Sequence, residues 1–307
     1  MRIVLGVDVS TFAEDACRFV ASRQWPTGTA VELVAAFEVP VDWTGLGPPG
    51  SDAVEPDRAA LEAILQERAV LLRNGGLAVT TTLEEGDPAA TITRRAEETY
   101  AQLIVVGSRR LGPIAAAVLG SVSAHLVDNA PCPVLVARSP GAARMLLATD
   151  GTDSSRNIPH VLASWGEAFR HLPVEVLSVA PRTRAFDPFY RLSPADAGPM
   201  AQPRSEEYLQ HERIADQVAD EMMDLGWHAA AVASIGDTER EILAAADMWR
   251  ADLIVTGSRG LGAIRRHLQG SVSHGLLIHS QSSLLVVRGV VPAPLKMAAA
   301  VSIATPA

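Results

Sequence analysis

Two glycine clusters and a hydroxyl-bearing turn are the residues of this sequence best suited to hold a phosphate chain. Gly257 and Gly260 follow the apolar segment 253–256, and Gly270-Ser271 comes after nine further residues, at the predicted start of a helix. Glycine has no Cβ, so the amides at the first two glycines can approach an anion closely and take up positive φ. The free N–H groups and the dipole of a helix start also favour negative charge. We therefore predict a polyphosphate site. The alternative is a tight strand-to-helix turn that needs glycine for backbone reasons alone.

Composition excludes several other chemistries. Lys296 is the only lysine, so neither a P-loop lysine nor a convincing Schiff-base lysine is present. The eight histidines do not cluster like metal ligands, and no G-x-S-x-G or H-E-x-x-H motif occurs. Cys132, between two prolines, is expected to be a small buried hydrophobe, with a reactive thiol as the alternative. We predict that the protein has no resident metal and is not an enzyme, or at most a weak ATPase.

Charge and hydropathy bear on partners and location. The net charge of −9 offers no basic face, so nucleic acid and anionic membranes are poor partners. No apolar run is long enough to span a membrane, and the first residues read as a strand rather than a signal peptide. Two cysteines in 307 residues suggest a reducing compartment. These features predict a cytoplasmic protein.

An internal repeat sets the organisation of the chain. Residues 103–112 return as 253–262 and residues 120–123 as 270–273, both 150 positions later, whereas residues 3–8 return as 145–150. The second copy therefore carries about eight extra residues between its second strand and second helix. A period of this length indicates a duplicated domain rather than a solenoid. The predicted boundaries are 1–139 for the first domain, 143–290 for the second and 291–307 for a tail.

Each copy alternates apolar strands with amphipathic helices. Thr11 and Asp87 are predicted to cap helices at their N-termini. Such an order indicates an α/β fold: two tandem, doubly wound domains, each a five-stranded parallel sheet with helices on both faces. The predicted strands are 3–8, 31–37, 77–83, 103–106 and 134–137 in the first copy, and 145–149, 174–179, 229–235, 252–256 and 283–287 in the second.

The motif G-x-x-G-x9-G-[ST], together with D-G-[ST] after the first strand, resembles the universal stress protein family. The resemblance covers both halves of the chain. The arrangement of two such domains in one chain is similar to that of tandem-domain members of the family. It implies an adenine nucleotide α-hydrolase-like fold and bound ATP, with or without Mg²⁺, in the second domain. The positions implied to hold the nucleotide are Asp150, Gly151, Thr152, Val179, Gly257, Arg259, Gly260, Gly270, Ser271, Val272 and Ser273.

The first copy departs from this pattern. Arg110 replaces the second glycine, the first strand ends in Asp8-Val9-Ser10 without glycine, and Ala36 replaces Val179. An arginine there either costs roughly 1 kcal/mol in strain, if positive φ is required, or fills or contacts the phosphate space. We predict a weaker or empty first site. Its residues are Asp8, Ala36, Gly107, Gly120, Ser121 and Ser123.

Three functions remain open at this stage. The first is an ATP-binding regulatory protein, a nucleotide sensor of the stress response with little or no turnover. The second is a slow ATP hydrolase or adenylate-forming enzyme. The third is a nucleotide-free dimerisation scaffold, because the resemblance implies pairing through the last strand. Val134–Val136 and Leu284–Val286 would then pair within the chain as a pseudo-dimer, with a homodimer of whole chains also open.

Overall fold

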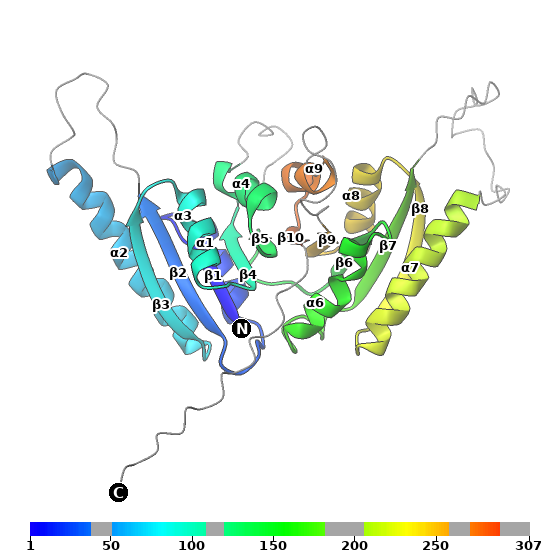
Figure 1. The fold of residues 1–307 in the computed structure, drawn as a ribbon, viewed down its shortest axis with the longest axis horizontal. Helices are drawn as coiled ribbons and strands as arrows, with labels where there is room; N and C mark the ends of the chain where they lie inside the picture. The colour runs from blue at the N-terminus through cyan, green and yellow to red at the C-terminus, as the bar shows by residue number, and fades with distance from the viewer. Residues whose placement is uncertain (38–50, 109–119, 182–205, 258–270, 289–307) are drawn as a thin grey trace, which may run out of the picture.

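The two halves of the chain share one ten-stranded sheet. The computed structural model describes residues 1–37, 51–108, 120–181, 206–257 and 271–288, with the side chains of 51–57 and 271 left out. The strand order is β3-β2-β1-β4-β5-β10-β9-β6-β7-β8. Figure 1 shows the first half on one side of the sheet centre and the second half on the other, with helices on both faces. The predicted pair of doubly wound domains is confirmed.

The first half contains five strands and four helices among its described residues. The predicted strands are all present, within one or two residues at most ends. The elements are β1 (Arg2–Gly6), α1 (Thr11–Ala21), β2 (Ala30–Phe37), α2 (Ser51–Asn74), β3 (Ala78–Glu85), α3 (Pro88–Glu98), β4 (Leu103–Gly107), α4 (Ser121–Asn129) and β5 (Val134–Ala137).

The second half repeats this order with one change. Its first helix is divided in two at Asn157, and Pro159 lies in the first turn of the second piece, where a missing N–H is tolerated. The elements are β6 (Met145–Thr149), α5 (Asp153–Arg156), α6 (Ile158–Ser164), β7 (Val174–Pro181), α7 (Glu206–Asp224), β8 (Ala229–Gly236), α8 (Thr238–Trp249), β9 (Leu253–Gly257), α9 (Ser271–His279) and β10 (Ser283–Val287).

Helix starts follow local capping chemistry. The Asp87 side chain accepts a hydrogen bond from Ala90 N at 2.7 Å, which confirms the predicted cap of α3. The prediction for Thr11 is wrong by one residue, because Ser10 is the N-cap of α1 and accepts from Ala13 N at 3.3 Å. Ser and Thr are both good caps, so the sequence alone does not separate two neighbours.

The halves join through their last strands. β5 and β10 run antiparallel, with Leu135 opposite Leu285 at the centre of the pairing, while all the other strand pairs described are parallel. This confirms the pairing predicted for the two last strands. The join leaves β3 and β8 as the two edges of the described sheet.

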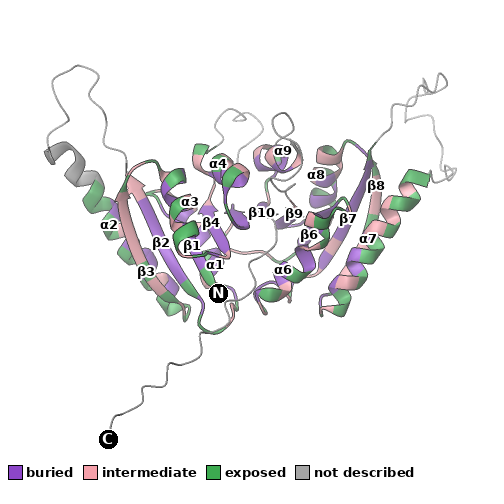
Figure 2. Cartoon of the chain, in the orientation of Figure 1, coloured by how far each residue is buried: buried purple, intermediate pink, exposed green. Residues whose placement is uncertain are grey.

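Each face of the sheet carries a continuous apolar core that crosses this junction. One core lies under α1, α2, α6 and α7, and the other under α3, α4, α8 and α9. Figure 2 shows the central strands almost entirely buried. On the first face, Phe19 and Trp25 from one half meet Trp165 and Phe169 from the other, with ring centroids 5.8–6.4 Å apart. Such aromatic packing makes the junction a core rather than a loose linker.

Two equivalent arginines cross the junction in opposite directions. Arg138 follows β5, is 3% exposed and donates to the carbonyls of Leu277 and Ser280 at the end of α9. Arg288 follows β10 and donates to the carbonyl of Val127, in the last turn of α4. Each cation thus satisfies carbonyls at the negative end of a helix in the other half. We call these two residues the junction arginines.

Other sequence-based expectations concern burial and membranes. Cys132 is 5% exposed, which agrees with its interpretation as a small buried hydrophobe. Within the described ranges, no helix combines the length and apolar character that crossing a bilayer requires. The predicted tail at 291–307 lies outside the described residues, as do most of the connectors after β2 and β7.

Candidate functional site

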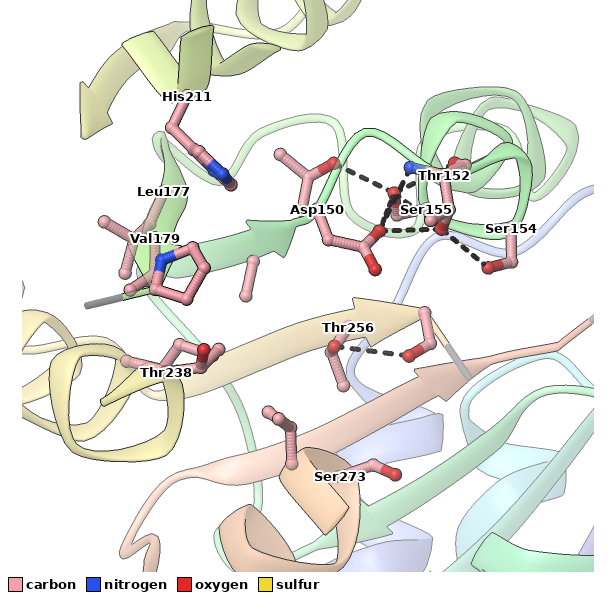
Figure 3. Close-up of a pocket in the computed structure, with 16 residues that line it drawn as sticks. Asp150, Thr152, Ser154, Ser155, Leu177, Val179, His211, Thr238, Thr256 and Ser273 are labelled. Atoms are coloured by element: carbon pink, nitrogen blue, oxygen red, sulfur yellow. Dashed lines mark hydrogen bonds between the residues drawn. The ribbon is translucent and has the colours of Figure 1, made fainter. Parts of the chain in front are cut away.

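A cavity of about 480 Å³ lies in the second half, at the carboxyl ends of β6, β7 and β9. It opens between β6 and β9, where the strand order of that half reverses. Doubly wound sheets bind ligands at this topological switch point, and the volume is in the range of small-molecule sites. Figure 3 shows its lining, which comprises Ala148, Thr149, Asp150, Thr152, Ser154, Ser155, Leu177, Val179, Pro181, His211, Thr238, Ile242, Thr256, Gly257, Val272 and Ser273.

The turn after β6 is fixed by its own hydrogen bonds. The Oδ1 atom of Asp150 accepts from Thr152 N at 3.1 Å, from Thr152 Oγ1 at 2.6 Å and from Ser155 Oγ at 2.9 Å. Gly151 lies between them with φ of +73°, a conformation that favours glycine. The D-G-T sequence therefore builds a wall of the cavity in which the hydrogen bonds of the turn orient the aspartate.

Gly257 does not have the backbone conformation predicted for it. It does not have positive φ. Instead, a Cβ built on it would lie 3.2 Å from the backbone N and Cα of Ser155. The expectation of positive φ is wrong, and the absence of a Cβ allows close packing of the end of β9 against α5. In the first half the equivalent contact is tighter, since a Cβ on Gly107 would lie 2.1 Å from the carbonyl oxygen of Phe12.

The first turns of α5, α8 and α9 contribute residues to the lining of the cavity. Val272 and Ser273 line it from the first turn of α9, and Thr238 from the first residue of α8. The orphan N–H groups and dipoles of helix starts attract anions. The α9 side of the cavity thus has the electrostatic character that a phosphate chain requires.

His211 lines the same cavity from α7 and was missed by the sequence analysis. Its Nδ1 lies 2.8 Å from Ser178 Oγ, and the same hydroxyl donates to the carbonyl of Thr149 at 2.9 Å. Burial lowers the pKa of His211 below its ordinary value, against the opposing influence of Asp150 and Glu207. Burial therefore favours the neutral form of the ring.

Several positions that surround the cavity are apolar in the first half. The strand registers and the buried residues of α2 and α7 place the two halves in correspondence. Five positions change from a group that can form hydrogen bonds to an apolar side chain. These pairs are Thr149 and Val7, Ser155 and Ala13, Ser178 and Ala35, His211 and Leu61, and Thr256 and Val106. A comparison of the two repeats, aligned strand by strand and helix by helix, would have found them.

The structure brings together part of the predicted second site. The predicted residues that line the cavity are Asp150, Thr152, Val179, Gly257, Val272 and Ser273. Gly151 lies in the turn after β6, between Asp150 and Thr152. Arg259, Gly260 and Gly270 lie outside the described residues, and Ser271 is described only as the first residue of α9. The convergence of the loop amides, which the sequence predicted, therefore stays a prediction.

In the first half, the predicted residues occupy equivalent places around the end of β4. Asp8 accepts a hydrogen bond from Ser10 N at 2.9 Å, as Asp150 does from Thr152. Gly120 is the N-cap of α4 with φ of −61°, Ser121 is the first residue of that helix, and Ser123 is buried. Ala36 lies near the end of β2, whereas Arg110 is outside the described residues.

The acidic and imidazole side chains do not assemble into a metal centre in the part of the chain that the structure describes. Of the two titratable side chains among the described lining residues, Asp150 is held by the β6 turn and His211 by Ser178. Figure 3 shows both on the β6 and α7 side of the cavity, with Ser273 on the opposite side.

Comparison with known proteins gives the same result for both halves. The model of the universal stress protein family matches residues 1–138 and again residues 142–288. A universal stress protein of Thermus aquaticus is 34% identical over 143 residues, which cover 44% of this chain and 97% of that protein. Another, from Synechocystis, is 32% identical over 137 residues, 44% of this chain and 83% of that protein.

A solved structure has the same fold over nearly all of the chain. The crystal structure of a universal stress protein from Archaeoglobus fulgidus has a TM-score of 0.65, with 94% of this chain and 98% of that chain covered. The sequence identity is 17%, so this similarity bears on the fold alone. Relatives with a single domain thus match half of the chain, and this two-domain structure matches nearly all of it.

Proposed function

This chain belongs to the universal stress protein family, and we propose that it is an ATP-binding member whose second half holds the nucleotide. The single observation that carries this proposal is the cavity of about 480 Å³ at the switch point between β6 and β9. Its fixed aspartate turn, its several hydroxyls and the helix start of α9 suit a ligand with a polar nucleoside and an anionic tail. The loop sequence Gly257-x-x-Gly260-x9-Gly270-Ser271 supports the same ligand.

The difference between the halves supports one site per chain. Thr149, Ser155 and Thr256 offer hydroxyls to the second cavity, whereas the equivalent first-half residues have only apolar side chains. A polar ligand at the equivalent place in the first half would lose hydrogen bonds to water and find fewer partners to replace them. The first half therefore serves as the structural partner of the second.

We propose that the protein acts as a regulatory nucleotide sensor of the stress response with little or no turnover. A general base must reach the attacking nucleophile. Asp150 and His211 lie on the side opposite α9, where the helix start would hold phosphate. Mg²⁺, if it accompanies ATP, would be held mainly by the phosphates, as is usual for this ion.

Calorimetric titration with ATP tests the proposal. We expect one ATP per chain for the wild type. Gly260→Arg, which copies Arg110, should weaken binding at least tenfold, and Thr256→Val, which copies Val106, by about threefold to tenfold, the value of one hydrogen bond. Arg110→Gly in the first half is the matched control and should leave the affinity of the second site unchanged.

Two results would favour the other candidate functions. The first result is a dissociation constant for ATP no lower than the millimolar range, together with an unchanged melting temperature in excess ATP. It would favour a structural role for the chain, as a scaffold paired through β5 and β10. Repeated release of phosphate, pyrophosphate or AMP would indicate a hydrolase or adenylate-forming enzyme instead.

A further inference from the structure

A buried polar pair beside the cavity distinguishes the second half from the first. Ser178 is fully buried on β7, and His211 on α7 lies against it and lines the cavity. At the equivalent positions the first half has Ala35 and Leu61, which are 1% and 8% exposed. The same fold is therefore built with an apolar pair, so packing alone does not require the serine and the histidine.

The hydrogen bonds of Ser178 define the state of the imidazole. A serine hydroxyl has one proton, and the carbonyl of Thr149 can only accept. Both contacts of the hydroxyl are satisfied when Ser178 donates to Thr149 and the Nδ1–H of His211 donates to Ser178. In a neutral ring, Nε2 then has a lone pair and no proton. His211 is thus held as a hydrogen-bond acceptor.

The position of this acceptor determines which part of a ligand it can meet. Figure 3 shows the ring pointing from α7 toward the ends of β6 and β7, between Asp150 and Val179. The phosphate-attracting start of α9 lies on the other side of the cavity. An acceptor is also chemically unsuited to ionised phosphates, which have acceptor oxygens and no proton to donate.

We propose that His211 is a specificity-determining residue that accepts, through Nε2, a hydrogen bond from the nucleoside part of the bound nucleotide. The available donors are the exocyclic amine of the base and the ribose hydroxyls. This inference rests on the proposed ATP binding and extends it to the groups that the site recognises. Ser178 is the positioning residue, because it fixes the tautomer and the orientation of the ring.

The charges around the ring are consistent with this role. Burial lowers the pKa of His211, while Asp150 from the β6 turn and Glu207 from α7 oppose that change. A protonated ring would donate from both nitrogens and lose the acceptor. The burial of the ring therefore preserves the form that recognises the nucleoside at neutral pH.

Three variants of His211 separate ligand recognition from structural support. His211→Asn retains an N–H group for Ser178 near the place of Nδ1 but has nothing at the place of Nε2. His211→Gln can place its amide oxygen near the position of Nε2. His211→Leu copies Leu61 of the first half. All three should retain the melting temperature of the wild type within a few degrees, because the first half folds with leucine at this position.

The affinity of the full chain for ATP is measured by calorimetry at pH 8. We expect His211→Asn and His211→Leu to weaken binding by about tenfold, the effect of one hydrogen bond, and His211→Gln to stay within about threefold of the wild type. ATP is then compared with ITP, 2′-deoxyATP and 3′-deoxyATP. The wild type should bind the one analogue that lacks the recognised donor about tenfold more weakly than ATP. His211→Leu should bind that analogue and ATP with the same affinity, because the hydrogen bond is already absent.

The outcomes distinguish this inference from the proposed function. If the wild type binds no ATP, both fail. If the wild type binds ATP and the asparagine and leucine variants bind it equally well, only the role of His211 is refuted. Rescue by asparagine rather than glutamine also refutes it, because asparagine retains only the contact with Ser178. The role of His211 is also refuted if each analogue lowers the binding affinity of the wild type and of His211→Leu by the same factor.

Discussion

The junction arginines allow the stability of the joined halves to be tested directly. Arg138→Leu removes the guanidinium that donates to the carbonyls of Leu277 and Ser280 at the end of α9, and it leaves most of the side-chain volume filled. The backbone N–H of Arg138 still donates to Ser283 Oγ at 3.1 Å. The change therefore isolates the charged contacts across the junction.

The magnitude follows from these two contacts. Hydrogen bonds to a charged group contribute about 1.5–3 kcal/mol each, and the dipole at the end of α9 adds to them. Burying the arginine charge at 3% exposure offsets part of this sum. We expect Arg138→Leu to lower the free energy of unfolding by about 3 kcal/mol, or the melting temperature by roughly 6–12 °C. Arg288→Leu should cost about half as much, because Arg288 is less buried and its second contact, to Ala130, is 3.4 Å long.

Urea and thermal unfolding measure both variants. Arg58→Leu is the control, because Arg58 pairs with Glu62 on an exposed helix surface, and such pairs contribute at most about 0.5 kcal/mol. A loss for Arg138→Leu no larger than that for the control would refute the view that the crossed arginines hold the halves together. An increase in stability would show that the cost of burying the charge exceeds the benefit of its contacts.

Three further predictions concern single side chains. Burial raises the pKa of Cys17 and Cys132 to about 12, so neither thiol should react with Ellman's reagent at pH 8 until the protein is unfolded, and fast labelling of either would contradict its burial. Burial also raises the pKa of Glu175, so the folded state binds its proton more tightly than the unfolded state does, and stability falls as pH rises above about 4.5. Glu175→Gln should therefore be more stable than the wild type at pH 7 and equal to it near pH 4 in urea unfolding; a constant difference between these pH values would refute this. Gly151→Ala should cost about 1–2 kcal/mol in the same assay, because φ is +73° and the new Cβ would lie 3.0 Å from Ile214; an unchanged midpoint would show that the turn relaxes.

The fold could be predicted because its signals are repeated and redundant. The recurrence of residues 103–112 as 253–262 fixes the duplication, and the continuous apolar strands fix a parallel sheet. Strand ends were less certain, since β7 continues to Pro181, two residues beyond the prediction. Patterns of burial define the centre of a strand better than its ends, where side chains pass gradually into solvent.

The candidate site was predicted only in part, for physical reasons. Asp150 and Ser273 adjoin glycine motifs that can be recognised in the sequence. His211 lies on α7, which is distant from both motifs along the chain. A lone histidine on an amphipathic helix has the pattern of a surface residue. Only the topology of β7 and α7 brings it to Ser178.

The junction arginines escaped prediction for a related reason. Arg138 and Arg288 stand at equivalent positions just after the last strand of each half, but a residue after a strand is usually exposed. Their burial depends on the antiparallel register of β5 and β10, which places each beyond the end of the opposite helix. Long-range contacts of this kind follow from the assembly of two elements and not from either one.

The antiparallel meeting of β5 and β10 inside a single chain also affects how the two halves can evolve. When two identical subunits associate, every mutation occurs on both sides of their symmetry axis, so a gain for one crevice is imposed on the other. Covalent fusion removes that constraint, because each gene segment mutates independently while the shared core is maintained. The leucine at position 61 and the histidine at position 211 show such a difference between equivalent positions of the two halves.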